Sequence, residues 1–254
     1  MRDLFQKSDF IPNIQKRFEG KQIRGMYSDI MDGKRYRRLS ENNGPLSLKY
    51  PYNISFTWNT DGVPVFKSSK FSLWPFFLTI NELPYKGRMK KENMIFAGFW
   101  YGPHKPFMLT FCKPNHESIL KLEQDGVTIE VSPGNEIVSK RFLLCGTCDL
   151  PTMKALVCNC MQFNGKYGCS KCLQPGETCK TSSGGHCHIF PFTTREPVGP
   201  ERTHEGTIAH AKQAVACDKP VYAIKGPSVL AYFTYYDVIQ GTTIDYMHCF
   251  TRNL

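Results

Sequence analysis

Two aspartates follow segments that are typical of β-strands, and their carboxylates have the chemistry to bind metal ions together. Asp61 comes after the alternating segment ISFTWNT, and Asp149 comes just after the apolar segment FLLCGT. If these strands are neighbours in one sheet, the two like charges lie close together and need a cation, and hard oxygen ligands favour Mg²⁺ or Mn²⁺. Two such ions can activate a water or a 3′-hydroxyl for in-line attack on a phosphodiester. The alternative, which spacing alone favours, is that each aspartate caps a turn or a helix.

A third acidic ligand is expected on a late helix, and three residues are candidates. Glu205 lies in RTHEG, Asp237 in YYDV and Asp245 in IDYMH. Only Asp245 is followed three positions later by a histidine, His248, and we therefore prefer it as the third ligand. Spacing alone favours the alternative that Asp245 is an N-cap followed by a partly buried histidine.

A cluster of cysteines and histidines between residues 163 and 192 has the spacing of a structural zinc site. Cys169 and Cys172 form a C-x₂-C knuckle, and His186 and His188 follow beyond a short loop that contains glycines. Two thiolates and two imidazoles meet the tetrahedral requirement of Zn²⁺. No H-E-x-x-H motif accompanies the cluster, so we expect a structural zinc rather than a catalytic one.

Other ligand sets remain compatible with this segment. Cys179 and Cys187 lie within it, so that three cysteines and one histidine, or another mixture, are also open. The chain has eleven cysteines, an odd and clustered set without a signal peptide, which indicates thiols in a reducing compartment rather than disulfides. Buried thiols without any metal are the remaining interpretation, and it suits the isolated cysteines best.

The elements that must position these residues alternate between strands and helices. The hydrophobic pattern predicts strands, then a helix that starts after Pro114, then further strands and a second helix. This order is that of a ribonuclease-H-like α/β fold, a mixed sheet flanked by helices, although many α/β domains share it. The predicted strands cover residues 54–59, 72–80, 93–101, 127–131 and 141–147, and the second helix covers 150–162.

The charge of the chain favours an anionic partner. Its 254 residues carry a formal net charge of +10, and half of that surplus lies in residues 1–50, which hold eleven Lys or Arg against six Asp or Glu. We interpret residues 1–50 as a basic arm that contacts phosphates and residues 51–254 as the core; a solvated face is the alternative for the arm. No run of about 18 apolar residues is present, which excludes a membrane span.

Six segments, in collinear order over about residues 50 to 250, resemble the transposase domains of CACTA (En/Spm-type) DNA transposons and their relatives. They are NTDGVPVFKSSKFSLWPFFLTINELP, CGTCDLPTMKALV, FNGKYGCSKCLQPGE, RTHE, KGPS and IDYMHC. The resemblance implies a transposase with three catalytic acids on a ribonuclease-H-like core. Its first acid matches Asp61, its second matches Asp149, and its cysteine knuckle matches Cys169 and Cys172.

The sequence also departs from that family pattern. In related plant sequences the late motif resembles D-x-M-H-x-E, and its glutamate would fall at Phe250 here. Asp245 remains as the expected third ligand. The chain stops at FTRNL, where relatives continue into a long apolar helix, so we expect a core that is incomplete at its C-terminus.

Two hypotheses of function follow. In the first, the chain is a DNA-cleaving and strand-transferring transposase domain that acts in the nucleus on transposon ends, with Mg²⁺ or Mn²⁺ held by Asp61, Asp149 and Asp245 and a structural Zn²⁺. Loss of the last helix would make this chain inactive. In the second, it is a non-catalytic, zinc-bearing DNA- or protein-binding remnant of a transposase. A homo-oligomer is compatible with both.

Overall fold

The computed structural model describes residues 2–19, 25–66, 70–149, 151–152, 159–161, 164–192, 194–195 and 199–245. The chain divides into two compact units, Met1–Gly146 and Thr147–Leu254. The fold is of the mixed α/β class, with one six-stranded mixed sheet and several helices. No helix in the described ranges has the length and apolar character needed to cross a membrane.

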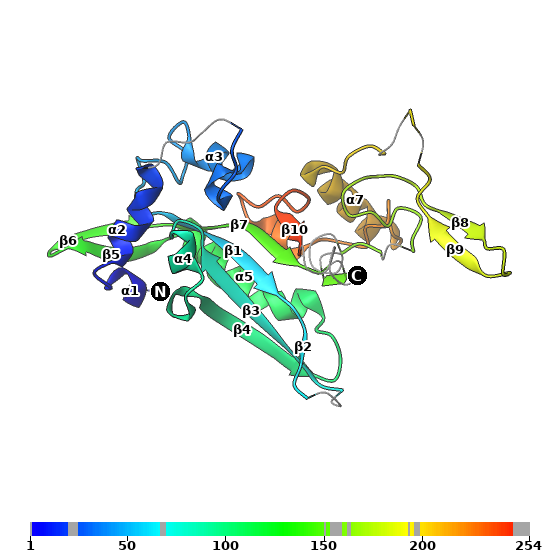
Figure 1. Ribbon diagram of the computed structural model, residues 1–254, viewed down its shortest axis with the longest axis horizontal. Helices are drawn as coiled ribbons and strands as arrows, with labels where there is room; N and C mark the ends of the chain where they lie inside the picture. The colour runs from blue at the N-terminus through cyan, green and yellow to red at the C-terminus, as the bar shows by residue number, and fades with distance from the viewer. Residues whose placement is uncertain are drawn as a thin grey trace. The chain divides into compact units, whose positions relative to one another are not determined.

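The large sheet has the strand order β10-β7-β1-β3-β2, and β4 also pairs with β3 (Figure 1). β1, β3 and β4 form an antiparallel meander, which agrees with the prediction of three successive strands linked by turns. The predicted bounds of β1 and β3 agree with the structure to within one residue, and β4 begins two residues later than predicted. The six strands are β1 (Ile54–Thr60), β2 (Val63–Pro64), β3 (Ser72–Ile80), β4 (Ile95–Gly102), β7 (Arg141–Cys148) and β10 (Thr242–Ile244).

β1 and β7 are parallel neighbours, because their contacts advance in the same direction along both strands. At the start of the pair, Ile54 N donates to Lys140 O at 3.2 Å. Farther along, Thr57 Oγ1 lies 3.1 Å from Cys145 Sγ. The sheet is therefore mixed: a parallel pair continues into an antiparallel meander.

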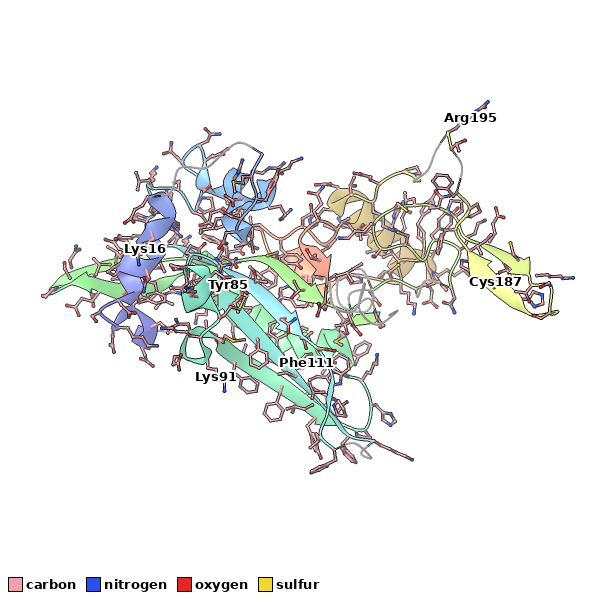
Figure 2. The ribbon with its side chains drawn as sticks, in the orientation of Figure 1. Lys16, Tyr85, Lys91, Phe111, Cys187 and Arg195 are labelled. Atoms are coloured by element: carbon pink, nitrogen blue, oxygen red, sulfur yellow. The ribbon has the colours of Figure 1, made fainter. Side chains whose placement is uncertain are left out.

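Helix α5 (Met108–Gln124) packs on the meander through its N-terminal half. Phe111 (labelled in Figure 2) contacts Phe76 of β3 edge-on, with ring centroids 6.1 Å apart. The prediction that this helix starts after Pro114 was wrong, because the helix begins at Met108 and contains the proline. Burial of Met108 and Phe111 stabilises the first turns, and this offsets the hydrogen bond that Pro114 cannot donate.

A separate two-stranded sheet follows α5. β5 (Val127–Ser132) confirms the strand predicted at 127–131, and it pairs with β6 (Asn135–Ser139), which the sequence did not predict. The polar sequence of β6 has no apolar alternation, so only its pairing with β5 defines it as a strand.

The regular structure described in the first fifty residues consists of short helices. Their apolar side chains Phe10, Ile14, Leu39 and Leu46 are buried in the first unit. Two more short helices lie between β3 and β4. These elements are α1 (Arg2–Phe5), α2 (Phe10–Gln15), η1 (Lys16–Phe18), η2 (Ile30–Asp32), α3 (Lys34–Ser40), α4 (Tyr85–Arg88) and η3 (Lys91–Asn93).

The second unit contains a hairpin, a helix and several loops. Most of the helix predicted at 150–162 lies outside the described residues. Cys160 forms an antiparallel bridge with Ile224, so the end of that predicted helix is extended instead. The described elements of this unit are β8 (Glu177–Lys180), β9 (His186–Ile189), α7 (His204–Cys217), η4 (Val229–Tyr232) and β10.

The contact between Trp58 and Gly146 yields a prediction about the core of the first unit. The Trp58 indole is fully buried, and a Cβ on Gly146 would overlap it. Gly146→Ala is therefore expected to lower the free energy of unfolding by about 1–3 kcal/mol through overpacking. The measurement is denaturant unfolding, with Gly87→Ala as the matched control, because a Cβ there meets nothing within 4 Å. Equal stability of the two variants would contradict the prediction.

Candidate functional site

Asp61 directly follows β1 and precedes β2, and these two strands pair with β3 in one continuous register. Its Oδ1 accepts a hydrogen bond from the backbone N–H of Gly62 at 2.7 Å. The Trp74 ring lies so close to Gly62 that a Cβ at that position would be 2.5 Å from it. Trp74 in turn donates from Nε1 to Ser72 Oγ at 3.0 Å. The segment that carries Asp61 is thus fixed by packing against Trp74 of β3.

Asp149 directly follows β7 and caps the segment after it. Its Oδ1 accepts a hydrogen bond from the backbone N–H of Thr152 at 2.8 Å, three residues on, which is the contact of a helix N-cap. The capping alternative from the sequence is therefore correct for Asp149. A capping oxygen leaves the carboxylate its charge, and hydrogen-bonded carboxylates also serve as metal ligands.

The three candidates for the late acid lie in different settings. Asp245 directly follows β10, and its backbone N–H donates to Cys148 O at 3.0 Å, so Asp245 and Asp149 follow paired strands. Asp237 accepts two backbone N–H groups in a local turn, both at 2.8 Å. Glu205 lies in the first turn of α7. His248, the predicted companion of Asp245, lies outside the described residues.

Cys169 and Cys172 are brought together on the tight turn that the knuckle spacing predicted. The backbone N–H of Lys171 donates to Cys169 Sγ at 3.4 Å. Burial acts to raise the pKa of Cys169, but hydrogen bonds from Lys171 and Cys172 outweigh it and lower the pKa. Burial raises the pKa of Cys172. One thiol of the pair is thus the readier to ionise.

Arg202 holds this knuckle in place, and the sequence analysis did not single it out. Its guanidinium donates to the carbonyl oxygens of Cys169, Tyr167 and Tyr222, each at 2.8 Å. Lys171 extends the anchorage, because its Nζ donates to Thr242 O at 2.7 Å at the start of β10. The only sequence signal for Arg202 was its place in the RTHE segment, since its acceptors are backbone carbonyls of any residue type.

His186 and His188 lie on β9 of the β8–β9 hairpin. In the register of this hairpin Cys179 pairs with Cys187, while the two histidines pair with other residues. Because side chains alternate along a strand, the two histidines share one face and the cysteine pair the other. His188 Nε2 is buried and has no hydrogen-bond partner among the described residues.

These residues do not form one closed metal centre. Within the described ranges, no group of three or more His, Cys, Asp or Glu side chains is placed to hold a metal ion. The zinc set of Cys169, Cys172, His186 and His188 and the magnesium set of Asp61 and Asp149 therefore stay predictions.

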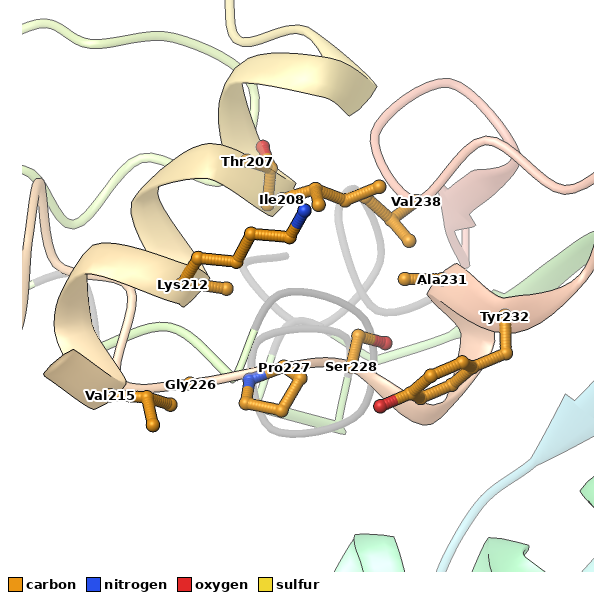
Figure 3. Close-up of a pocket in the computed structure, with 11 residues that line it drawn as sticks. Thr207, Ile208, Lys212, Val215, Gly226, Pro227, Ser228, Ala231, Tyr232 and Val238 are labelled. Atoms are coloured by element: carbon orange, nitrogen blue, oxygen red, sulfur yellow. The ribbon is translucent and has the colours of Figure 1, made fainter.

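The second unit also contains an apolar pocket with a volume of about 370 Å³ (Figure 3). Ile208 and Val215 of α7 line one side of it, and Pro227 and Tyr232 line another. None of its described lining residues is an Asp, Glu, Cys or His, so this pocket supplies no ligand to either predicted metal set.

The N-cap contact of Asp149 leads to a prediction that separates folding from chemistry. Asp149→Ala should lower the free energy of unfolding by about 0.5–2 kcal/mol, whereas Asp149→Asn should keep the cap and change it little. Thermal or denaturant unfolding measures both. Thr203→Ala is the matched control, because Thr203 Oγ1 accepts from Gly206 N at 3.0 Å and caps α7. Its loss of unfolding free energy shows the size of effect to expect when an N-cap of this chain is removed. Equal loss of stability in both Asp149 variants would show that the cap is unimportant.

Comparison with protein families places this chain beside a known family of transposases. A family model described as Transposase family tnp2 matches residues 24–192, which is more than half of the chain. The matched range contains Asp61, Asp149 and the knuckle, and it ends before Asp245. Comparisons with curated proteins and with solved structures gave no match.

Proposed function

Because the chain belongs to the transposase family tnp2, the CACTA (En/Spm) transposases, we propose that it is a transposase core that cleaves DNA and transfers its strands. Membership of the family implies that DNA is the partner. The substrate in this proposal is the transposon end, and the place of action is the nucleus. The proposed fold of the core is ribonuclease-H-like, with Asp61, Asp149 and Asp245 as its acids.

One observation carries the proposal: Asp61 and Asp149 each directly follow a strand, and those strands, β1 and β7, are parallel neighbours. A meander of three strands, a helix, and then a strand parallel to the first is the order that a ribonuclease-H-like core requires. The sheet order β4-β3-β1-β7-β10, with α5 between β4 and β7, supports it.

The donor chemistry of the aspartates fits a divalent ion. Each of Asp61 and Asp149 has one carboxylate oxygen oriented by a backbone N–H, as metal-binding carboxylates commonly have. Mg²⁺ or Mn²⁺, when bound, supplies the Lewis acid that activates the attacking hydroxyl and stabilises the leaving oxygen. Asp245, which follows the strand paired with β7, is the proposed third ligand. Exposed lysines and arginines would hold the phosphate backbone.

The proposal is tested by metal-dependent nicking of DNA. Asp61→Asn and Asp149→Asn should each lower the Mg²⁺- or Mn²⁺-dependent rate by more than about a hundredfold, because several kcal/mol of transition-state stabilisation depend on the ions. Asp245→Asn should do the same if Asp245 is the third ligand. Asp237→Asn is the matched control, since asparagine keeps the two local hydrogen bonds of Asp237.

One outcome would overturn this proposal. If wild type and Asp61→Asn show the same background nicking, the chain has no aspartate-dependent catalysis. Salt-sensitive DNA binding without any metal requirement would then favour the non-catalytic remnant instead.

A structural zinc ion at the knuckle is a separate part of the proposal. The paired thiols of Cys169 and Cys172 fit such an ion, and the buried, unpartnered Nε2 of His188 fits the role of a further ligand with His186. This zinc would stabilise the second unit without taking part in cleavage.

Metal analysis of protein purified without chelator tests the zinc. One Zn²⁺ per chain is expected, and Cys169→Ser should lose it, whereas Cys217→Ser, an exposed cysteine at the end of α7, should keep it. Removal of the zinc by a chelator should lower the unfolding temperature of wild type and leave that of Cys169→Ser unchanged. Wild type without zinc would contradict the assignment.

A further inference from the structure

The face of the meander opposite α5 carries a row of aromatic side chains. A β-bulge adds Phe96 to this row, because Phe76 pairs with Gly98 while the next residue, Phe77, pairs with Phe96. The extra residue at position 97 shifts the alternation of β4, so that Phe96 and Phe99 lie on the same face. We call this row the aromatic stripe; its members are Phe71, Phe77, Phe96, Phe99 and Tyr101.

The rings of the stripe contact one another and remain open to solvent. Phe96 and Phe99 stack with centroids 5.9 Å apart, and Phe71 and Tyr101 stack at 5.3 Å. Phe96, Phe99 and Tyr101 are 54%, 57% and 56% exposed. Aromatic side chains that are grouped and exposed to this extent mark a binding surface rather than a core.

The charge of the chain segments that adjoin β3 and β4 in sequence favours an anionic partner. The described residues from 70 to 107 contain five exposed lysines but a single exposed acid, Glu92, since Glu82 is buried. Aromatic faces flanked by lysines suit a single nucleic-acid strand, whose bases stack and whose phosphates are anionic. The five lysines are Lys70, Lys86, Lys90, Lys91 (labelled in Figure 2) and Lys105.

The same bulge argues against a second copy of the chain as the partner. Among the strands that the structure describes, β4 pairs with β3 alone, so its other edge would be available for strand addition. A bulge within an edge strand disrupts such pairing. The stripe lies on the face of the sheet, which a strand added at the edge would not cover.

We propose that the aromatic stripe binds unpaired bases of a single DNA strand. The proposal rests on the proposed function, because the stripe lies near Asp61. Thr60 pairs with Phe76 and Phe76 pairs with Gly98, so Phe99 follows Gly98 at the level where Asp61 follows Thr60. Because β3 lies between β1 and β4, the backbones of Asp61 and Phe99 are two strand spacings apart, about 10 Å. A strand stacked on Phe99 would thus lie beside the acid of β1.

The test compares the affinity for a single-stranded oligodeoxythymidylate with that for a duplex of the same length, by fluorescence anisotropy. Phe99→Ala and Tyr101→Ala should each weaken single-strand binding by about five- to a hundredfold and leave duplex binding unchanged. The ratio of the single-strand affinity of each variant to that of wild type should stay constant as the salt concentration is raised, since stacking releases no counterions. Phe99→Tyr should retain the affinity.

Phe192→Ala is the matched control, because Phe192 is 72% exposed but lies in the second unit. Unfolding temperatures of all variants verify that they fold. If both alanine variants bind the single strand as wild type does, the proposal for the stripe is overturned. If metal-dependent nicking is observed at the same time, the proposed function still holds. Failure of wild type to bind either form of DNA overturns both. A fall in oligomeric mass in the alanine variants without a change in DNA affinity assigns the face to a second copy and also overturns the proposal.

Discussion

The first unit depends on one buried carboxylate, that of Glu82. Glu82 follows β3, is fully buried, and accepts hydrogen bonds from Ser55 N at 2.8 Å and Ser55 Oγ at 2.7 Å. Burial raises its pKa, while Arg17, 3.6 Å away in η1, opposes that shift. Breaking a buried ion pair by removing one partner is strongly destabilising. The N-terminal helices therefore cannot leave the sheet without exposing Glu82 or leaving it buried without Arg17. These helices are therefore part of the fold of the core.

Part of the positive charge of the chain is therefore used inside the fold. Arg17, counted among the basic residues at the N-terminus, is buried and also donates to Asn53 O and Pro51 O. Arg88 pairs with Asp29 at 2.8 Å, and burial lowers the pKa of Arg141 to about 10. Arg202 binds three carbonyl oxygens. A net charge of +10 thus overstates the charge that is free to meet DNA, and the exposed lysines carry more of that role.

The sequence predicted the parts of the fold that alternate clearly. β1 and β3 have one buried face each, so their bounds follow from period-two burial. The start of α5 could not be predicted, because packing of Met108 and Phe111 outweighs the proline inside the helix. The positions of Asp61 and Asp149 after strands were visible in the sequence, and so was the cysteine knuckle. The hydrogen bonds of Arg202 were not visible in the sequence, since their acceptors are backbone oxygens distant along the chain.

The tight packing of the indole rings against glycines has a consequence for spectroscopy. All three tryptophans of the chain, Trp58, Trp74 and Trp100, lie in the meander, with Trp58 against Gly146 and Trp74 against Gly62. The second unit has none. Tryptophan emission accordingly reports on the first unit and not directly on the knuckle, the hairpin or α7. Their unfolding is visible instead through the reactivity of the cysteines, of which the second unit holds most.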